Sequence, residues 1–299
     1  AAGNYTVVAT NAMTSCTSTM TGSKSVSINA LPNATITSSD SDSKFCSGAS
    51  ITFTANTGMS NYKFMVGSSP VQTGTSNTYS TTSLANGNVV SVMVTDSKGC
   101  SSTVYGNSNT VYPLPKIAIG SDVERCDSGQ IMLYATPDTN GTSIRWYDVA
   151  SNGSIVGSGN NFENKFTETK TYYAESYNDT TGCAAAQRKA IKGIVVTQAQ
   201  ITQNPQNARI CNNGNTSFSV IASNSKSYQW EVKKAGTTAW YPILEAGGNP
   251  TYAGWNTNTL TLSVVPSSQN DNLFRCIVGS TPCDNIISEE AVLQVSNID

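Results

Sequence analysis

The chain has 299 residues, only 12% of them charged, with a formal net charge of −2 and a pI near 5.2. So small a charge provides no field that would attract nucleic acid or an anionic membrane, and neither is expected as a partner. With few Lys and Glu, the surface must be covered by Ser, Thr and Asn, which favour strands and turns over helices. The sequence contains no run of 18 apolar residues, so direct membrane insertion is not expected either.

The opening residues read as the last two strands of a β-domain. Residues 2–7 form the first predicted strand, with Tyr5 where a tyrosine corner would lie, and residues 25–28 form the second. Two strands alone are at best marginally stable in water. We therefore expect residues 1–31 to be the C-terminal part of a module that a longer polypeptide, or another molecule, completes.

Three further modules follow with the same landmarks. Each has a cysteine, an aromatic residue 18 to 20 positions later in an alternating strand, and a second cysteine at a turn. These triplets are Cys46, Phe64 and Cys100; Cys126, Trp146 and Cys183; and Cys211, Trp230 and Cys283. Spacings of 80 and 85 residues between the first cysteines are too long for a solenoid repeat and suit independent β-sandwiches.

Apolar residues alternate with polar ones inside these modules, which predicts strands with one buried face. The alternating positions are Ile51 and Phe53, Tyr62 and Phe64, Val90, Val92 and Val94, Ile131 and Leu133, Ile144 and Trp146, and Tyr172 and Ala174. We expect an all-β chain of tandem immunoglobulin-like β-sandwich domains in an elongated rod. The expected domains are the partial module 1–31 and complete modules at 32–115, 116–198 and 199–299.

Eight cysteines at regular positions, without any histidine, favour disulfides made in an oxidising compartment over zinc sites. By the logic of the repeat, we pair Cys46 with Cys100 and Cys126 with Cys183, each within its own module.

The third module leaves two candidates for Cys211. Alternation places Cys276 on an inward face, whereas Cys283 occupies the turn position of Cys183. We favour Cys211 with Cys283, which leaves Cys276 as a buried thiol. Cys16 corresponds to Cys100 and Cys183, and its partner is expected in the part of the first module that precedes residue 1.

Two sets of residues resemble a known family. Residues 92–100, Val-Met-Val-Thr-Asp-Ser-Lys-Gly-Cys, form one set, and residues 228–232 with 274–278 and Cys283 form the other. They resemble the Ig-like and PKD-like repeats of giant surface adhesins from Bacteroidetes, such as the gliding-motility adhesins exported by the type IX secretion system. The resemblance covers nearly the whole chain and implies an extracellular location at the cell surface. A type IX sorting domain is not visible in the sequence.

Enzyme chemistry finds little support, because the chain has no histidine for the usual triads and its acids form no spaced motif. No cofactor is expected. Four aspartates after the linkers, Asp40, Asp42, Asp122 and Asp127, are weak candidates for Ca²⁺ ligands, and polar turns with nothing bound are the favoured explanation because no spaced loop of ligands is present.

Candidate contact residues lie in two places. Trp240, Tyr241, Tyr252 and Trp255 crowd into a Gly- and Asn-rich stretch, where aromatic platforms could stack on sugars, or could instead pack against the sheet. Asp179-Thr180-Thr181 resembles the O-glycan acceptor of Bacteroidetes, so Thr180 is a candidate for glycosylation.

These observations favour an extracellular stalk of a cell-surface adhesin that projects and transmits force in adhesion or gliding. Its expected partners are a surface polysaccharide or another cell-surface ligand, and neighbouring modules. Two alternatives remain open, namely a filament subunit assembled by strand complementation and a carbohydrate-binding module of a secreted protein.

Overall fold

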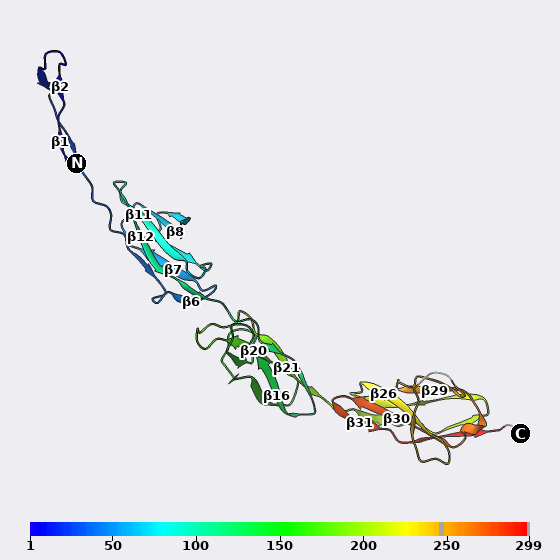
Figure 1. Cartoon of the computed structure of the whole chain (residues 1–299). Coiled ribbons are helices and arrows are strands. Elements are labelled where there is room, and N and C mark those ends of the chain that lie inside the picture. Colours follow the sequence, from blue (N-terminus) through cyan, green and yellow to red (C-terminus); the bar gives the residue numbers. More distant parts are fainter. Residues whose placement is uncertain (245–247, 298–299) are drawn as a thin grey trace. The chain divides into compact units, whose positions relative to one another are not determined.

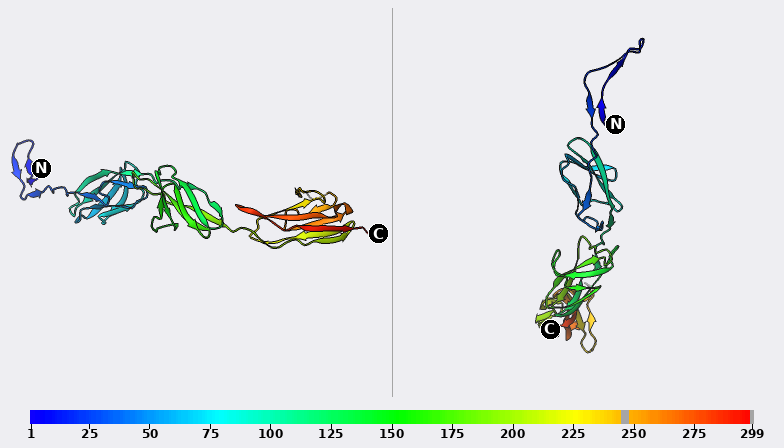
Figure 2. Two further views of the ribbon diagram at one scale, coloured as in Figure 1. Left: turned by 90° about the horizontal axis from the view of Figure 1, so that it is seen from below. Right: turned by 90° about the vertical axis from the view of Figure 1, so that its left-hand side faces the viewer.

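The computed structural model describes residues 1–244 and 248–297. Within these ranges the chain consists of β-strands and loops, with a single turn of 3-10 helix, η1 (Ser267–Gln269) (Figures 1 and 2). Its contacts divide it into two units, one of Ala1–Leu114 with Asn178–Cys183, the other of Pro115–Tyr177 with Ala184–Asp299. In the described ranges, no helix has the length and apolar character needed to cross a membrane.

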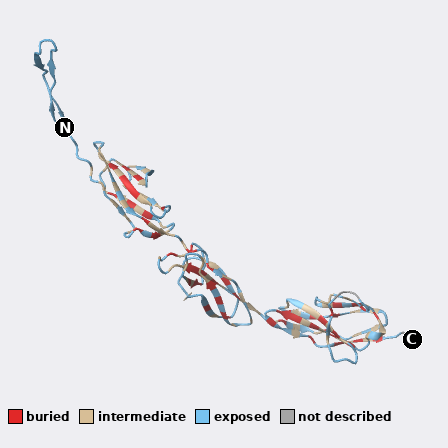
Figure 3. Ribbon diagram, in the orientation of Figure 1, coloured by how far each residue is buried: buried red, intermediate tan, exposed pale blue. Residues whose placement is uncertain are grey.

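Within the first 31 residues, Gly3 to Val26 form a long antiparallel hairpin. Its four short strands pair β1 with β4 and β2 with β3, and their bounds are β1 (Gly3–Tyr5), β2 (Val8–Thr10), β3 (Thr17–Thr19) and β4 (Lys24–Val26). The Tyr5 hydroxyl donates a hydrogen bond to the Ala1 carbonyl, 2.6 Å away. The hairpin is exposed along its whole length, including Val7 and Val8 (Figure 3).

Apolar residues between Ala34 and Val111 form one core, and we call the domain built around it sandwich I. One sheet has the order β5-β7-β10 and the other the order β9-β8-β11-β12, while β6 pairs with β13. The bounds are β5 (Ile36–Ser38), β6 (Lys44–Cys46), β7 (Ile51–Ala55), β8 (Asn61–Val66), β9 (Ser69–Gly74), β10 (Thr78–Thr81), β11 (Val89–Thr95), β12 (Ser101–Ser108) and β13 (Thr110–Tyr112).

A second core lies between Ala118 and Val195 and defines sandwich II. Its sheets have the orders β14-β16-β19 and β15-β21-β20-β17-β18. The bounds are β14 (Ile119–Gly120), β15 (Val123–Cys126), β16 (Gly129–Thr136), β17 (Ser143–Tyr147), β18 (Gly157–Ser158), β19 (Asn161–Phe166), β20 (Lys170–Tyr177) and β21 (Lys189–Val196).

Sandwich III has its core between Ala199 and Val295. Its sheets are β24-β29-β28 and β23-β32-β30-β26-β27, with β31 added to β30 and a separate pair β22-β25. The bounds are β22 (Gln200–Gln203), β23 (Ala208–Cys211), β24 (Gly214–Ser219), β25 (Ile221–Ser223), β26 (Ser227–Lys233), β27 (Tyr241–Pro242), β28 (Thr251–Ala253), β29 (Thr259–Val265), β30 (Asn272–Ser280), β31 (Cys283–Ile287) and β32 (Ala291–Ser296).

The alternating pattern of the sequence is confirmed residue by residue. Phe64, Trp146 and Trp230 each lie on the strand predicted for them, and none exposes any surface. Since two packed sheets keep every second side chain away from water, the inward positions are apolar. The all-β, immunoglobulin-like fold is thus established, whereas the limits assigned to the modules stay a prediction.

One feature of the pairing positions the cysteines. In each sandwich a short strand near the beginning runs parallel to the last strand, namely β6 with β13, β15 with β21 and β23 with β32. Each short strand ends in a cysteine, and the partners of Cys46, Cys126 and Cys211 are Tyr112, Val196 and Ser296. Because these partners are the last residues of their strands, each cysteine lies where the chain leaves its sandwich.

Candidate functional site

Two disulfides join cysteines of different sandwiches. Cys46 is bonded to Cys183, 137 residues away, with their Cα atoms 5.7 Å apart. Cys126 is bonded to Cys283, 157 residues away, with a Cα separation of 4.7 Å. The predicted pairs, Cys46 with Cys100, Cys126 with Cys183 and Cys211 with Cys283, are therefore wrong.

The sheet geometry explains why the pairs within one module cannot form. Cys100 directly precedes β12, whereas Cys46 lies beside Tyr112, at the far end of β13. About 12 residues of extended chain separate the two places, which is roughly 40 Å. A disulfide needs Cα atoms about 4.4 to 6.8 Å apart. The two cysteines of one sandwich lie at its opposite ends, which is too far apart for them to be bonded.

The side chain of Asn178 shapes the hairpin that carries Cys183. The Asn178 Oδ1 accepts hydrogen bonds from the N–H groups of Thr180 and Thr181, each 3.0 Å away. The Asn178 N–H donates to the Cys183 carbonyl at 2.8 Å, and Gly182 adopts a φ of +73°, which favours glycine. This Asx turn therefore defines the backbone of the hairpin that presents Cys183 to Cys46.

The junction around Cys126 and Cys283 contains polar contacts as well. The Ala199 N–H donates to the buried Ser280 Oγ at 3.0 Å. Lys226 and Glu124 form an ion pair of 3.9 Å, in which both side chains are about half exposed. Such an exposed pair contributes little, so the covalent bond dominates this junction.

The remaining cysteines differ sharply in their surroundings. Among the described residues, Cys16, Cys100, Cys211 and Cys276 are not in disulfides. Cys276 is fully buried opposite Trp230, and burial raises the pKa of its thiol to about 12. The prediction of a buried thiol at Cys276 is confirmed, although the partner assigned to Cys211 was wrong.

The four aromatic candidates do not form one platform. Tyr252 and Trp255 are partly buried against the core of sandwich III, and burial raises the pKa of the Tyr252 hydroxyl. Trp240 is covered by cations, with the Arg275 guanidinium carbon 4.1 Å and the Lys233 ammonium 4.9 Å from its ring centre. Tyr241 is half exposed. A ligand contact at these residues stays a prediction.

The carboxylates proposed for Ca²⁺ serve as local hydrogen-bond acceptors. Asp40 and Asp42 both accept the Lys44 N–H at 3.1 Å, and Asp122 accepts the Lys192 N–H at 2.8 Å. Asp127 accepts the Gln198 N–H at 3.5 Å. Within the described ranges, no three acidic, cysteine or histidine side chains gather as a possible metal site.

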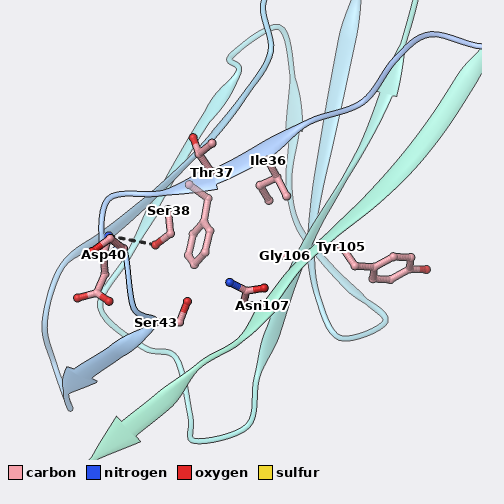
Figure 4. Close-up of a pocket in the computed structure, with 10 residues that line it drawn as sticks. Ile36, Thr37, Ser38, Asp40, Ser43, Tyr105, Gly106 and Asn107 are labelled. Atoms are coloured by element: carbon pink, nitrogen blue, oxygen red, sulfur yellow. Dashed lines mark hydrogen bonds between the residues drawn. The ribbon is translucent and has the colours of Figure 1, made fainter.

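Sandwich I has a cleft of about 320 Å³ along the seam between β5 and β12 (Figure 4). Ser38, Asp40 and Asn107 lie on its walls with the half-buried Ile36, and the core residue Phe53 also lines it. Within the cleft, the Asp40 N–H donates a hydrogen bond to Ser38 Oγ, 3.2 Å away. The cleft is lined mainly by polar residues, and nothing in it points to a particular ligand.

Sequence reasoning missed one buried charged cluster. Glu175 is ion-paired with Arg188 at 3.2 Å, accepts a hydrogen bond from the Tyr147 hydroxyl at 2.9 Å, and is 8% exposed. The Arg188 guanidinium also lies over the Tyr147 ring and donates to the carbonyls of Val149 and Asn152. Both Glu175 oxygens and the Nε and Nη1 of Arg188 have partners within this cluster, so it braces β17 and β20, which are neighbours inside their sheet.

Thr180, the predicted glycan acceptor, is exposed in the Asx turn, and glycosylation there stays a prediction.

Comparison with known proteins finds distant similarities. No curated protein matches the chain. Among solved structures, Drosophila OTK extracellular domains 3–5 align with 84% of this chain and 93% of theirs, at 12% identity and a TM-score of 0.40. A three-domain titin fragment aligns with 85% of this chain and 95% of its own length, at 10% identity and a TM-score of 0.38. The fibronectin(III)-like modules of Clostridium thermocellum CbhA align with 55% of this chain and 95% of theirs, at 20% identity and a TM-score of 0.33.

A family profile matches part of the chain. Residues 114–196, which contain sandwich II, match a family described as "Ig-like domain CHU_C associated". The match covers one of the three sandwiches and supports the immunoglobulin-like fold read from its two sheets. The chain is thus a tandem array of Ig-like repeats, and residues 114–196 are the part that carries the family signature.

Proposed function

We propose that this chain is the repeat region of an extracellular adhesin stalk, which projects a binding part from the cell surface and transmits force to it. The observation that carries the proposal is the pair of disulfides between successive sandwiches. The resemblance of residues 92–100 to repeats of Bacteroidetes adhesins supports a role in adhesion or gliding. Catalysis has no part in the proposal.

Disulfides across a junction alter how a chain responds to tension. Without them, the linker after each sandwich is the only covalent route for force. With them, the bonds close loops of 137 and 157 residues, which taken singly are equivalent to roughly 450 and 520 Å of extended chain at about 3.3 Å per residue and which share residues 126–183. A pulled molecule therefore cannot release that length until a sulfur–sulfur bond breaks.

Single-molecule stretching tests the mechanical part of the proposal. We expect the oxidised chain, held at its two ends, to reach a much shorter full extension than the reduced chain. A double variant Cys126→Ser with Cys283→Ser should recover part of the difference, and Tyr241→Ala should recover none. Equal extension before and after reduction would contradict a role in transmitting force.

Cells test the biological part. An antibody against this region should label intact cells, and cells whose protein carries the double serine variant should detach at lower shear than cells with Met132→Ala, a change at an exposed residue of sandwich II. Labelling only after lysis would overturn the proposal that this region is an extracellular stalk. If both strains detach at the same shear, the disulfides transmit no adhesive force and the region acts only as a passive spacer.

A second candidate function is supported by the hairpin of residues 1–31. Aligning Asn11 with Asp96, the first residues of matching turns, places Tyr5 and Val7 at the positions of Val90 and Val92, which are fully buried in sandwich I. In the hairpin, Tyr5 is 51% and Val7 62% exposed. Such a face would be covered if strands of another molecule completed the sandwich, as in a filament built by strand complementation. Concentration-dependent assembly, abolished by Val7→Asp, would support this function, and a monomer at all concentrations would exclude it.

A further inference from the structure

The cysteines fall into two structural classes. Cys46, Cys126 and Cys211 end the short strands that run parallel to the last strand of their sandwiches, and we call them strand cysteines. Cys16, Cys100 and Cys183 end hairpin turns, and we call them hairpin cysteines, together with Cys283, which follows β30 in the same topological place. Both disulfides join one strand cysteine to one hairpin cysteine of the next sandwich.

Cys211 has the same backbone environment as the two bonded strand cysteines. After each of the three, the next residue donates its N–H to the carbonyl opposite the cysteine. These bonds are Ser47 to Tyr112 at 2.8 Å, Asp127 to Val196 at 2.9 Å and Asn212 to Ser296 at 2.9 Å. Unlike its bonded equivalents, Cys211 is exposed and carries a thiol. The geometry that is bonded twice in this chain is therefore present a third time without a partner among the described residues.

The hairpins of Cys16 and Cys100 repeat that of Cys183. The N–H groups of Asn11, Asp96 and Asn178 donate to the carbonyls of Cys16, Cys100 and Cys183 at 2.9, 2.9 and 2.8 Å.

The side chains close the same turn in each case. Asn11 and Asp96 each accept two backbone N–H bonds through Oδ1, as Asn178 does. The residue before the cysteine has a positive φ in all three turns, at Ser15, Gly99 and Gly182. Cys16 is exposed and Cys100 partly exposed, so both thiols can be reached.

We propose that Cys211 is a docking point for the hairpin cysteine of another Ig-like module of this kind, and that Cys100 and Cys16 bond in the same way to strand cysteines. The partner is thus defined chemically as an Asx-type hairpin ending in a thiol, carried by an Ig-like sandwich. It comes either from a second copy of this chain or from a module whose sequence lies outside residues 1–299. The inference rests on the cross-sandwich disulfides and not on adhesion, so it can fail while the stalk proposal stands.

The bond forms by oxidation of two thiols. The Cys211 thiol and the partner thiol lose two electrons and two protons in total, and one sulfur–sulfur bond replaces two sulfur–hydrogen bonds. The oxidant is the disulfide form of a thiol oxidoreductase or of glutathione, which becomes two thiols by exchange through a mixed disulfide.

Disulfide mapping of the protein isolated unreduced from its source tests the proposal. Free thiols are first blocked with N-ethylmaleimide, and trypsin then releases Cys211 in Ile210–Lys226 and Cys100 in Gly99–Lys116. We expect Ile210–Lys226 to be linked to another peptide. Linkage to the Cys100 or Cys16 peptide identifies a second copy as the source, and linkage to a hairpin peptide absent from residues 1–299 identifies another module.

The contrary outcomes are equally defined. Cys211 found blocked by N-ethylmaleimide, or bonded to a second Cys211 or to Cys276, overturns the proposal. A Cys211→Ser variant should lose the linked peptide and leave its former partner blocked by the reagent. Cys276 serves as the internal control, because a buried thiol should react only after denaturation.

Discussion

Cys126, at the end of β15, lies 4.7 Å in Cα separation from Cys283, at the start of β31, although 157 residues separate them in the sequence. The strand cysteine of one sandwich thus meets the hairpin of the next, and Cys46 with Cys183 repeats the relationship. On the chain-entropy account, closing loops of this length stabilises the folded chain by about 5 kcal/mol for each bond.

Removing one of these bonds should lower the free energy of unfolding. We expect the double variant Cys126→Ser with Cys283→Ser to lose about 4 to 5 kcal/mol, because the unfolded chain regains the entropy that the bond removes. Denaturant unfolding monitored by Trp fluorescence measures the loss. Cys16→Ser, which removes an exposed thiol, is the control and should change stability by less than about 0.5 kcal/mol. Equal stabilities would show that the bond constrains the unfolded chain little.

The Asx turn should govern how quickly Cys46 and Cys183 find each other. Asn178→Ala removes the acceptor of two backbone hydrogen bonds, so we expect slower formation of the Cys46–Cys183 bond during oxidative refolding. The Cys126–Cys283 bond should form at its usual rate and provides an internal reference. Acid-quenched peptide mapping follows both bonds. Thr180→Ala, in the same turn, should leave both rates unchanged, and an equal slowing by this control would count against the turn.

The buried aromatic residue of each sandwich should be a major contributor to stability. Trp230 is completely buried and its Nε1 donates to the Thr257 carbonyl at 2.9 Å. We expect Trp230→Ala to cost about 3 to 5 kcal/mol through the cavity it leaves. Tyr241→Ala, at a half-exposed site in the same sandwich, should cost less than about 1 kcal/mol. Chemical denaturation of both variants compares them directly.

The Glu175–Arg188 pair should contribute far more to the free energy of unfolding than the exposed pair of Lys226 and Glu124. Each side chain of the first pair is 11% exposed, so Arg188→Ala leaves a buried carboxylate without its cation and should cost about 3 kcal/mol. Lys226→Ala breaks a pair in which both members are about half exposed and should cost less than about 1 kcal/mol. Similar losses in the two variants would show that burial does not set the difference.

The thiol of Cys276 should make the stability of sandwich III depend on alkaline pH. Burial raises its pKa from 9.0 to about 12, so the folded state keeps a proton that the unfolded state loses above about pH 9. The contribution is therefore complete below pH 9 and is lost as the pH rises towards 12. Unfolding of the protein and of Cys276→Ala, measured from pH 8 to 11, should show a steeper decline for the unmodified protein. Parallel curves would show that the thiol is not the group responsible.

Much of the fold follows from the order of residues alone. Period-two alternation in β8, β11, β16 and β26 places Phe64, Val92, Leu133 and Trp230 in the cores because a strand points successive side chains to opposite faces. The same rule predicted that Cys276 faces inward. These are local properties, so the sequence determines them without knowledge of the partner strands.

The pairing of the cysteines was decided only by the tertiary structure. Alternation says which face a cysteine occupies but not at which end of a sandwich it lies. The parallel pairing of β6 with β13 carries Cys46 to the end where the chain leaves sandwich I, roughly 40 Å of strand away from Cys100. Sequence proximity favoured the partner within the module, whereas the short reach of a disulfide requires the hairpin of the next sandwich.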